Sequence, residues 1–196
     1  LAGIRYSYQN NRRATVDSIA KGSTGSIAAY TNDAFSPRVG LVYQPSKKLS
    51  VFTSYTNSFT VNTGRDITGA ALPPSIVDQF ELGAKSDLAN GLLSINLTLY
   101  QIINDNLAQT ALILADGSPN TDNTIRELAG EVTSKGVELD IATKPIYGLT
   151  FMAGYSFNET KYTGGNGKNF TTGDRLRYNP AHTANASVFY AFPVKS

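Results

Sequence analysis

The chain has 196 residues, of which 41% are hydrophobic and 16% are charged, and its formal net charge is +2. The charged fraction is well below the roughly 25% of ordinary soluble domains, and so small a net charge gives no argument for nucleic-acid binding. Cysteine is absent, which excludes disulfides, thiol nucleophiles and thiolate metal sites. The sequence has no run of about 18 consecutive apolar residues, so it predicts no membrane-spanning helix.

Alternation of apolar and polar residues with a period of two predicts β-strands along most of the chain. The connections between the strands alternate between long polar segments and short turns. The predicted strands are, in chain order, 2–9, 36–44, 49–59, the two arms of a hairpin at 79–101, 131–143, 149–160 and 182–192. The long connections are 10–34, 60–78, 102–126 and 161–180.

The hairpin at 79–101 shows the pattern most clearly. Its second arm places four aliphatic residues on one face and only polar residues on the other: Leu93, Ile95, Leu97 and Leu99. Asn90 and Gly91 supply the positive φ angles that a tight turn needs. An apolar face of this kind must be covered by a second sheet, as in a sandwich, or by lipid, as in a membrane barrel.

The alternation of long and short connections favours the barrel. In an up-and-down meander it places every long loop at one rim, as in outer-membrane barrels, which have short periplasmic turns and long extracellular loops. The opposite face carries charges that suit a polar lumen: Arg5, Arg38, Glu81, Lys85, Glu138 and Asp140. Aromatic residues near strand ends are expected to form interfacial girdles: Tyr6, Tyr8, Tyr43, Tyr55, Tyr100, Tyr155, Tyr190 and Phe192.

The predicted fold is therefore all-β, an antiparallel up-and-down meander of about eight strands that forms part of a transmembrane β-barrel. A soluble, secreted β-sandwich that serves as an adhesin or carbohydrate-binding module is the alternative. A third hypothesis, a small outer-membrane enzyme, would depend on His182, the single histidine. No GxSxG nucleophile elbow surrounds any serine, so we expect His182 to be structural and the protein not to be an enzyme.

Several segments in the same order resemble the barrel of TonB-dependent siderophore receptors. They extend over about residues 35–192, and the resemblance rests on their combination. The segments are Ser36-Pro37-Arg38-Val39-Gly40-Leu41-Val42-Tyr43-Gln44-Pro45, Leu49–Tyr55, Leu72-Pro73-Pro74, Gln79–Lys85, Ser134–Asp140, Gly148–Phe157 and Asn179–Ala184.

The resemblance implies a barrel of about 22 strands around a plug domain, located in the bacterial outer membrane. Such receptors take up ferric siderophores with energy delivered by the TonB complex. The sequence begins and ends within the strand pattern and contains neither a plug nor a TonB-contacting segment. Residues 1–196 are therefore expected to be an internal part of the barrel, with outer-membrane lipid, a ferric siderophore and, through the absent plug, TonB as partners.

The long loops hold the candidate ligand-binding residues. Arginine and tyrosine suit ferric siderophores, which are often anionic and partly aromatic. The candidates are Tyr30, Arg65, Arg126, Arg175 and Tyr178. We expect no cofactor and no metal bound by protein side chains, because the siderophore already fills the coordination shell of the iron. Asp116-Gly117-Ser118 and Asp122-Asn123 lack the spacing of a calcium loop and are expected to form turns.

Overall fold

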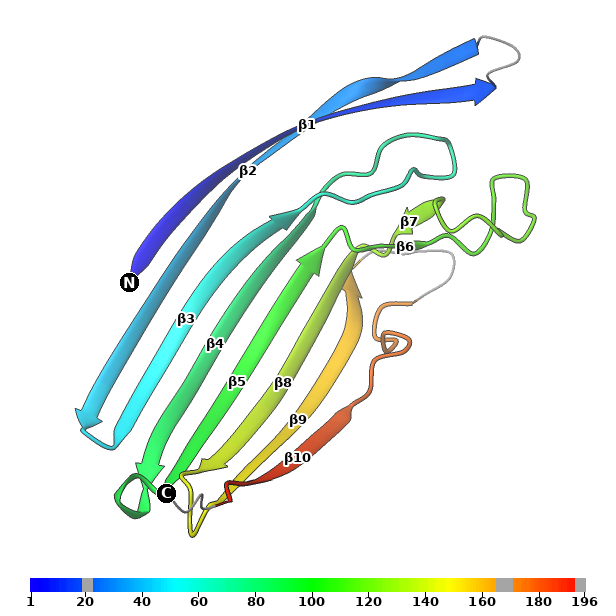
Figure 1. Ribbon diagram of the computed structural model, residues 1–196. Coiled ribbons are helices and arrows are strands. Elements are labelled where there is room, and N and C mark those ends of the chain that lie inside the picture. The colour runs from blue at the N-terminus through cyan, green and yellow to red at the C-terminus, as the bar shows by residue number, and fades with distance from the viewer. Residues whose placement is uncertain (19–22, 165–170, 193–196) are drawn as a thin grey trace.

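The computed structural model describes residues 1–18, 23–164 and 171–192, with the backbone alone for 11–18 and 23–30. Eight strands lie side by side in one curved antiparallel sheet in the order β1-β2-β3-β4-β5-β8-β9-β10 (Figure 1). Their bounds are β1 Ala2–Ser18, β2 Ser23–Ser46, β3 Leu49–Thr60, β4 Ser75–Leu88, β5 Leu93–Asp105, β8 Glu131–Thr143, β9 Leu149–Gly164 and β10 His182–Tyr190.

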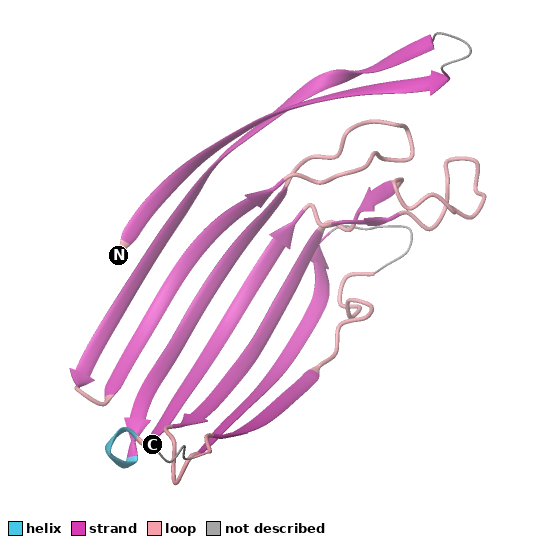
Figure 2. Cartoon of the chain, viewed as in Figure 1, coloured by secondary structure: helices cyan, strands magenta, loops and turns pink. Residues whose placement is uncertain are grey.

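The connections separate onto two rims (Figure 2). Short turns join β2 to β3, β4 to β5 and β8 to β9, whereas the long segments 61–74 and 106–130 lie at the opposite rim. Within 106–130, β6 (Ala108–Thr110) and β7 (Arg126–Leu128) pair in a small second sheet. The meander and its alternating rims are thus confirmed. No helix in the described ranges is long and apolar enough to cross a membrane.

Strand register assembles one continuous apolar face, because directly opposed residues of antiparallel strands share a face. Leu82 opposes Leu99, which opposes Val137, which in turn opposes Phe157. Leu97 on the same face is 42% exposed. The strands of the described part of the chain place no second layer over this face, so the sandwich alternative is wrong.

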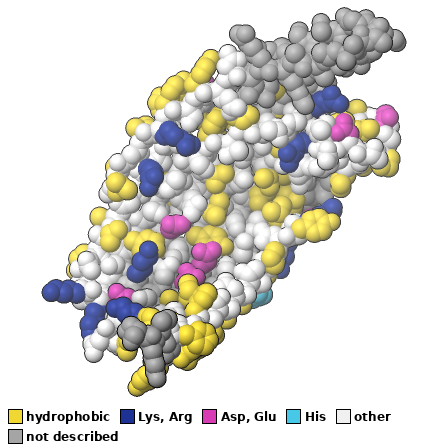
Figure 3. Space-filling view, viewed as in Figure 1, with side chains coloured by type: hydrophobic (Ala, Val, Ile, Leu, Met, Phe, Trp, Pro, Cys, Tyr) yellow, Lys and Arg dark blue, Asp and Glu magenta, His cyan; other side chains and the backbone are white. Residues whose placement is uncertain are grey.

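The other face of the sheet is polar. Glu81 opposes Tyr100, and Lys85 opposes Asn96, which opposes Asp140. Acidic and basic side chains are visible over the middle of the sheet in Figure 3. The six charged residues that the sequence predicts for the polar face all occupy positions on that face. Many of the polar side chains beside them form hydrogen bonds. For example, the Ser54 hydroxyl donates to the Glu81 carboxylate at 3.0 Å.

Two aromatic residues on the polar face cover glycines of the neighbouring strand. Phe52 lies over Gly83, and Tyr100 lies over Gly136. The Lys85 Nζ lies 5.4 Å from the centre of the Phe52 ring, a cation–π contact. The assignment of Tyr100 to an interfacial girdle is therefore wrong: the missing side chain of Gly136 creates room for the ring on the polar face.

The predicted connection at 10–34 is also wrong, because β1 and β2 continue through most of it. In the same way β4 begins at Ser75 and β5 ends at Asp105. Where a strand continues beyond the hydrocarbon region, its backbone hydrogen bonds to the neighbouring strands persist, but its side chains no longer need to be apolar. Its polar composition then looks like that of a loop.

The tight turn between β4 and β5 runs through η1 (Ala89–Gly91), whose backbone angles are not those of a regular 3₁₀ helix. Its three residues have φ angles of 47°, 58° and 82°. The expected role of Asn90 and Gly91 is confirmed, since these two residue types tolerate positive φ best.

We predict that Gly136→Ala destabilises the sheet by about 1–3 kcal/mol, the usual cost of overpacking. The new Cβ would meet the Tyr100 ring and the Phe157 carbonyl oxygen. Gly40→Ala is the matched control on the same face, because its nearest atom would lie 3.8 Å away. Thermal unfolding of the complete protein in detergent tests this; equal stability of the two variants would contradict the packing described.

Candidate functional site

The long-loop rim contains the buried hydrophobic cluster of the described residues. Ala129, Val132 and Tyr162 are 0%, 4% and 4% exposed, and Leu107 and Leu176 pack against them. Tyr162 opposes Val132, which opposes Asn104, so the cluster lies on the polar face of the sheet. Segments 106–130 and 171–178 are therefore held against the upper part of this face.

A pocket of ≈ 440 Å³ lies between these segments and β9. It combines two arginines and two tyrosines with amide, hydroxyl and aliphatic groups, a composition suited to an anionic and partly aromatic ligand. Its lining residues are Leu107, Ala108, Gln109, Thr110, Leu112, Arg126, Tyr162, Leu176, Arg177 and Tyr178. We refer to it as the rim pocket.

Arg126 is the cation most firmly held in the rim pocket. Its Nη2 donates to the carbonyl oxygen of Ala108 at 2.9 Å, and its aliphatic stem lies against Gly64. Its Nε is buried and donates to no acceptor in the described part of the chain. A buried donor of this kind is costly unless a ligand or water satisfies it.

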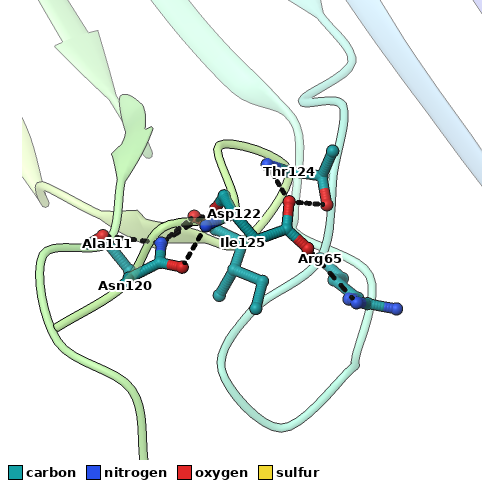
Figure 4. Close-up of polar contacts among 6 residues, drawn as sticks. All are labelled: Arg65, Ala111, Asn120, Asp122, Thr124 and Ile125. Carbon is teal, nitrogen blue, oxygen red and sulfur yellow. Dashed lines mark hydrogen bonds and ion pairs between the residues drawn. The ribbon is translucent and has the colours of Figure 1, made fainter. Parts of the chain in front are cut away.

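Segments 61–74 and 106–130 are joined by an interloop clasp, formed by Asn62, Gly64, Arg65, Asp122, Thr124 and Arg126. The Arg65 N–H donates to the Thr124 carbonyl oxygen at 3.1 Å, and the Arg126 N–H donates to the Arg65 carbonyl oxygen at 2.8 Å. The Arg65 Nη2 lies 3.6 Å from the Asp122 Oδ2 (Figure 4). Because this ion pair is about half exposed, the backbone bonds contribute most of the connection.

Side chains within 106–130 shape the clasp (Figure 4). The Asn120 Nδ2 donates to the carbonyl oxygens of Ala111 and Asp122 at 2.8 and 2.9 Å. The Asp122 Oδ1 accepts from the Thr124 N–H and hydroxyl at 2.8 and 2.7 Å. Asp116 makes the same two contacts with Ser118. Both aspartates therefore form turns, as predicted.

The contacts of Asp122 lower the pKa of its carboxyl group below the ordinary value of 3.8. The hydrogen bond from the Thr124 hydroxyl is the largest cause, followed by the Thr124 N–H, with a smaller contribution from the charge of Arg65. The folded loop thus favours the carboxylate. Its contribution to loop stability is complete above pH 3.8 and is lost as the pH falls through the lowered pKa.

The five candidate ligand-binding residues are not all brought together. Arg126 and Tyr178 line the rim pocket, whereas Arg65 belongs to the interloop clasp. Arg175 forms an isolated antiparallel β-bridge with Lys161, whose position in β9 belongs to the apolar face. Tyr30 lies in β2, and its side chain is outside the described part of the structure.

Sequence reasoning missed four polar residues of the rim pocket: Gln109, Thr110, Tyr162 and Arg177. Tyr162 could have been found by continuing the period-two pattern of Asn158 and Thr160 beyond the predicted strand end. Gln109 and Arg177 come from separate segments with no periodic signal.

His182 lies on the apolar face, where it opposes Phe157. Its Nδ1 is 2.8 Å from the Tyr155 hydroxyl, and its ring centre is 5.1 Å from that of Phe157. These contacts fix His182 as part of the sheet surface, in agreement with the expected structural role.

A single-layer antiparallel wall, apolar on one side, polar on the other and bearing its described long segments at one rim, has the geometry of an outer-membrane β-barrel. The family described as "TonB dependent receptor-like, beta-barrel" matches residues 1–195. The chain belongs to this family. Its members are bacterial outer-membrane receptors and transporters rather than enzymes, so the strands of this chain cross the outer membrane.

Individual proteins agree with this assignment. The chain is 32% identical over 126 residues to the ferric-pyoverdine 358 receptor of Pseudomonas putida, covering 64% of this chain and 15% of the receptor. It is 28% identical over 162 residues to the metal-pseudopaline receptor CntO of Pseudomonas aeruginosa, covering 83% and 22%. The chain thus spans about a fifth of the length of such relatives.

The fold agrees as well. The crystal structure of BauA, the ferric preacinetobactin receptor of Acinetobacter baumannii, superposes with a TM-score of 0.66 at 20% identity. The match covers 99% of this chain and 27% of BauA.

Within the residues that the structure describes, no group of three or more histidine, aspartate or glutamate residues is arranged to hold a metal ion.

We predict that Gly64→Ala opens the interloop clasp. Gly64 has a φ of 98°, and a Cβ there would lie 2.5 Å from the Thr124 carbonyl oxygen. Gly69→Ala is the control, because Gly69 has a similar φ of 86° with no atom within 4 Å. Hydrogen exchange at the Arg65 and Arg126 amides of the intact receptor should accelerate about tenfold or more in Gly64→Ala alone. Equal exchange in both variants would mean that the clasp does not depend on this contact.

The lowered pKa of Asp122 predicts acid sensitivity of the clasp. Spin labels at Ile67 and Ile113 should give an unchanged distance distribution from pH 7 to about pH 4 and a broader one at lower pH. Asp122→Asn keeps an acceptor oxygen but cannot be protonated, so it should reduce this acid broadening. Broadening between pH 7 and pH 5 would contradict the assignment of the transition to Asp122.

Proposed function

We propose that this chain is part of the barrel wall of an outer-membrane receptor that takes up ferric siderophores, and that the rim pocket is part of its ligand site. The observation that carries the proposal is the wall itself, in which an apolar ladder faces lipid while charged and amide groups line an aqueous interior. Relatives named as ferric-pyoverdine, metal-pseudopaline and ferrioxamine B receptors support siderophores as the ligand class.

The position and chemistry of the rim pocket support its role in ligand contact. It lies on the lumen side at the long-loop rim, which is the extracellular rim in outer-membrane barrels. Arg126 and Arg177 offer positive charge to an anionic chelate, and the Tyr178 ring offers a surface for stacking. The buried Nε of Arg126 is ready to donate to a ligand oxygen.

The clasp orients Arg126 in this proposal. The backbone N–H of Arg126 donates a hydrogen bond to the Arg65 carbonyl oxygen, and the aliphatic part of the Arg126 side chain lies against Gly64. Segments 61–74 and 106–130 therefore both hold this one cation in place. Fixing a side chain before the ligand arrives lowers the entropy lost on binding. The iron is cargo in this scheme, held by the siderophore and not by protein side chains.

We further propose that the eight strands close into a larger barrel with strands beyond β1 and β10, around a plug through which the TonB complex acts. β1 and β10 are the sheet edges, and open edges in a membrane-spanning sheet would leave backbone groups unsatisfied. The share of about a fifth of the relatives' length is consistent with this arrangement.

Tyr178→Ala tests the ligand site. Tyr178 is fully exposed with a φ of 58°, so its removal should leave the fold intact. Tyr147 at the short-turn rim is the matched control, being 96% exposed with a φ of 50°. We expect Tyr178→Ala to weaken binding of ferripyoverdine or ferrioxamine B about tenfold, the scale of one aromatic contact, and Tyr147→Ala to leave it unchanged.

The measurement is titration of the purified intact receptor with each ferric siderophore, followed by uptake of radioactive iron into iron-starved cells. Uptake that persists in cells without TonB would overturn the transport proposal. Unchanged binding by Tyr178→Ala would remove Tyr178 from the site.

A further inference from the structure

The lower part of the polar face, toward the short-turn rim, contains a second pocket. Its volume is ≈ 570 Å³, within the range of small-molecule sites. Basic and acidic side chains gather over this part of the face in Figure 3. We refer to it as the exit pocket, and polar residues from several strands line it: Gln44, Ser50, Lys85, Asn96, Asp140 and Asn185.

Strand register assembles the exit pocket as one row of side chains. Lys85 opposes Asn96, which opposes Asp140. Gly154 on β9 opposes both Asp140 and Asn185, and it hollows the row. A Cβ at Gly154 would lie 2.9 Å from the Asn185 Nδ2 and 3.2 Å from the Asp140 Oδ1. Because neighbouring strands hold each member, the row has the rigidity that a binding site needs.

The exit pocket and the rim pocket lie toward opposite ends of the same face. Gly154 lines the exit pocket and Tyr162 lines the rim pocket. Both residues belong to β9, on which they lie roughly 27 Å apart at about 3.4 Å per residue. Short turns are periplasmic in outer-membrane barrels. The exit pocket is therefore at the periplasmic end of the lumen wall, away from the entry side.

Asn96 has an unused acceptor in the exit pocket. Its Nδ2 donates to the Asp140 Oδ2 at 3.4 Å. This contact sets the orientation of the amide, because the flipped amide would turn one acceptor toward another. The Asn96 Oδ1 is then buried and accepts no hydrogen bond from the described part of the chain. A buried acceptor of this kind is costly unless a ligand or water donates to it.

Lys85 supplies positive charge beside this acceptor. Its Nζ lies 5.4 Å from the centre of the Phe52 ring, and no carboxylate of the described residues lies within 4.0 Å of it. A cation–π contact leaves N–H donors of the ammonium group for a ligand. The row thus offers a cation, a free amide oxygen and the Asp140 carboxylate. These groups match a chelate that carries anionic oxygens and amide N–H groups.

We propose that Lys85, Asn96 and Asp140 form a second subsite, which holds the ferric chelate at the periplasmic end of the lumen before its release. Lys85 donates to an anionic oxygen of the chelate, and the two oxygen acceptors bind its amide N–H groups. The Asp140 carboxylate offsets part of the attraction between Lys85 and an anion, which allows the chelate to leave. This inference rests on the proposed transport function but requires no residue of the rim pocket.

The direct test is photocrosslinking during uptake by cells that produce the intact receptor. A benzophenone amino acid replaces Ser94, which lines the exit pocket on the same face of β5 as Asn96. The control replaces Leu97, on the apolar face of that strand. We expect ferripyoverdine to be crosslinked at position 94 and not at position 97. Uptake of ferripyoverdine without a crosslink at position 94 would overturn the subsite alone, whereas failure of the transport function would be seen as loss of uptake.

Variants of Lys85 test its assigned role. Lys85→Gln should lower the crosslink yield and the maximal uptake rate about tenfold, the scale of one charge-assisted hydrogen bond, while ferripyoverdine binding at the cell surface stays unchanged. Lys85→Arg should retain both. Arg38→Gln is the matched control, because it removes one positive charge from the same face outside the exit pocket, and it should behave like wild type.

Two results with these variants would overturn the proposal. The first is an equal loss of crosslink yield in Lys85→Gln and Arg38→Gln, which would reflect the charge of the whole face. The second is faster hydrogen exchange of the plug in Lys85→Gln before any siderophore is added, since the exit pocket would then hold the plug and not the chelate.

Discussion

The structure depends on the satisfaction of backbone hydrogen bonds in a sheet of which one face meets hydrocarbon. Lipid offers no partner for a backbone N–H or C=O group, so each must be paired with a neighbouring strand. Antiparallel register supplies these pairs and, in the same step, decides the face of every side chain. The register places Leu82, Leu99, Val137 and Phe157 in one row on the lipid-facing side of the sheet. A shift of the register by one residue would instead turn Glu81 and Glu138 toward lipid.

The polar face and the loops follow from the same constraint. Residues that point away from lipid are free to carry charge, and they form a surface on which loops can pack through small clusters such as Tyr162 with Leu176. The described chain has no large hydrophobic core, because its apolar side chains are directed outward. Loop order therefore comes from backbone bonds and side-chain caps at Arg65, Asn120 and Asp122.

The sequence of a single strand was sufficient to predict those features in which a residue's environment depends on that strand alone. The alternation from Leu93 to Leu99, the turn at Asn90 and Gly91 and the inward phase of Glu138 could all be predicted in this way. It failed where geometry involves a neighbouring strand or loop. Tyr100 faces the lumen because Gly136 makes room for it, and Arg65 is used in the clasp because Gly64 lets Thr124 approach. The rim pocket combines Arg126 with Arg177 across three segments, which no single period encodes.

The most direct test of the central claim is a spin-label scan of residues 93–99 on β5 in the intact receptor, reconstituted in bilayers. Accessibility to oxygen, which partitions into lipid, is compared at each position with accessibility to a water-soluble nickel chelate. The account predicts alternation with a period of two, with high oxygen accessibility at Leu93, Ile95, Leu97 and Leu99 and low values at Ser94, Asn96 and Thr98. Low oxygen accessibility at all positions, without alternation, would contradict a lipid-facing wall.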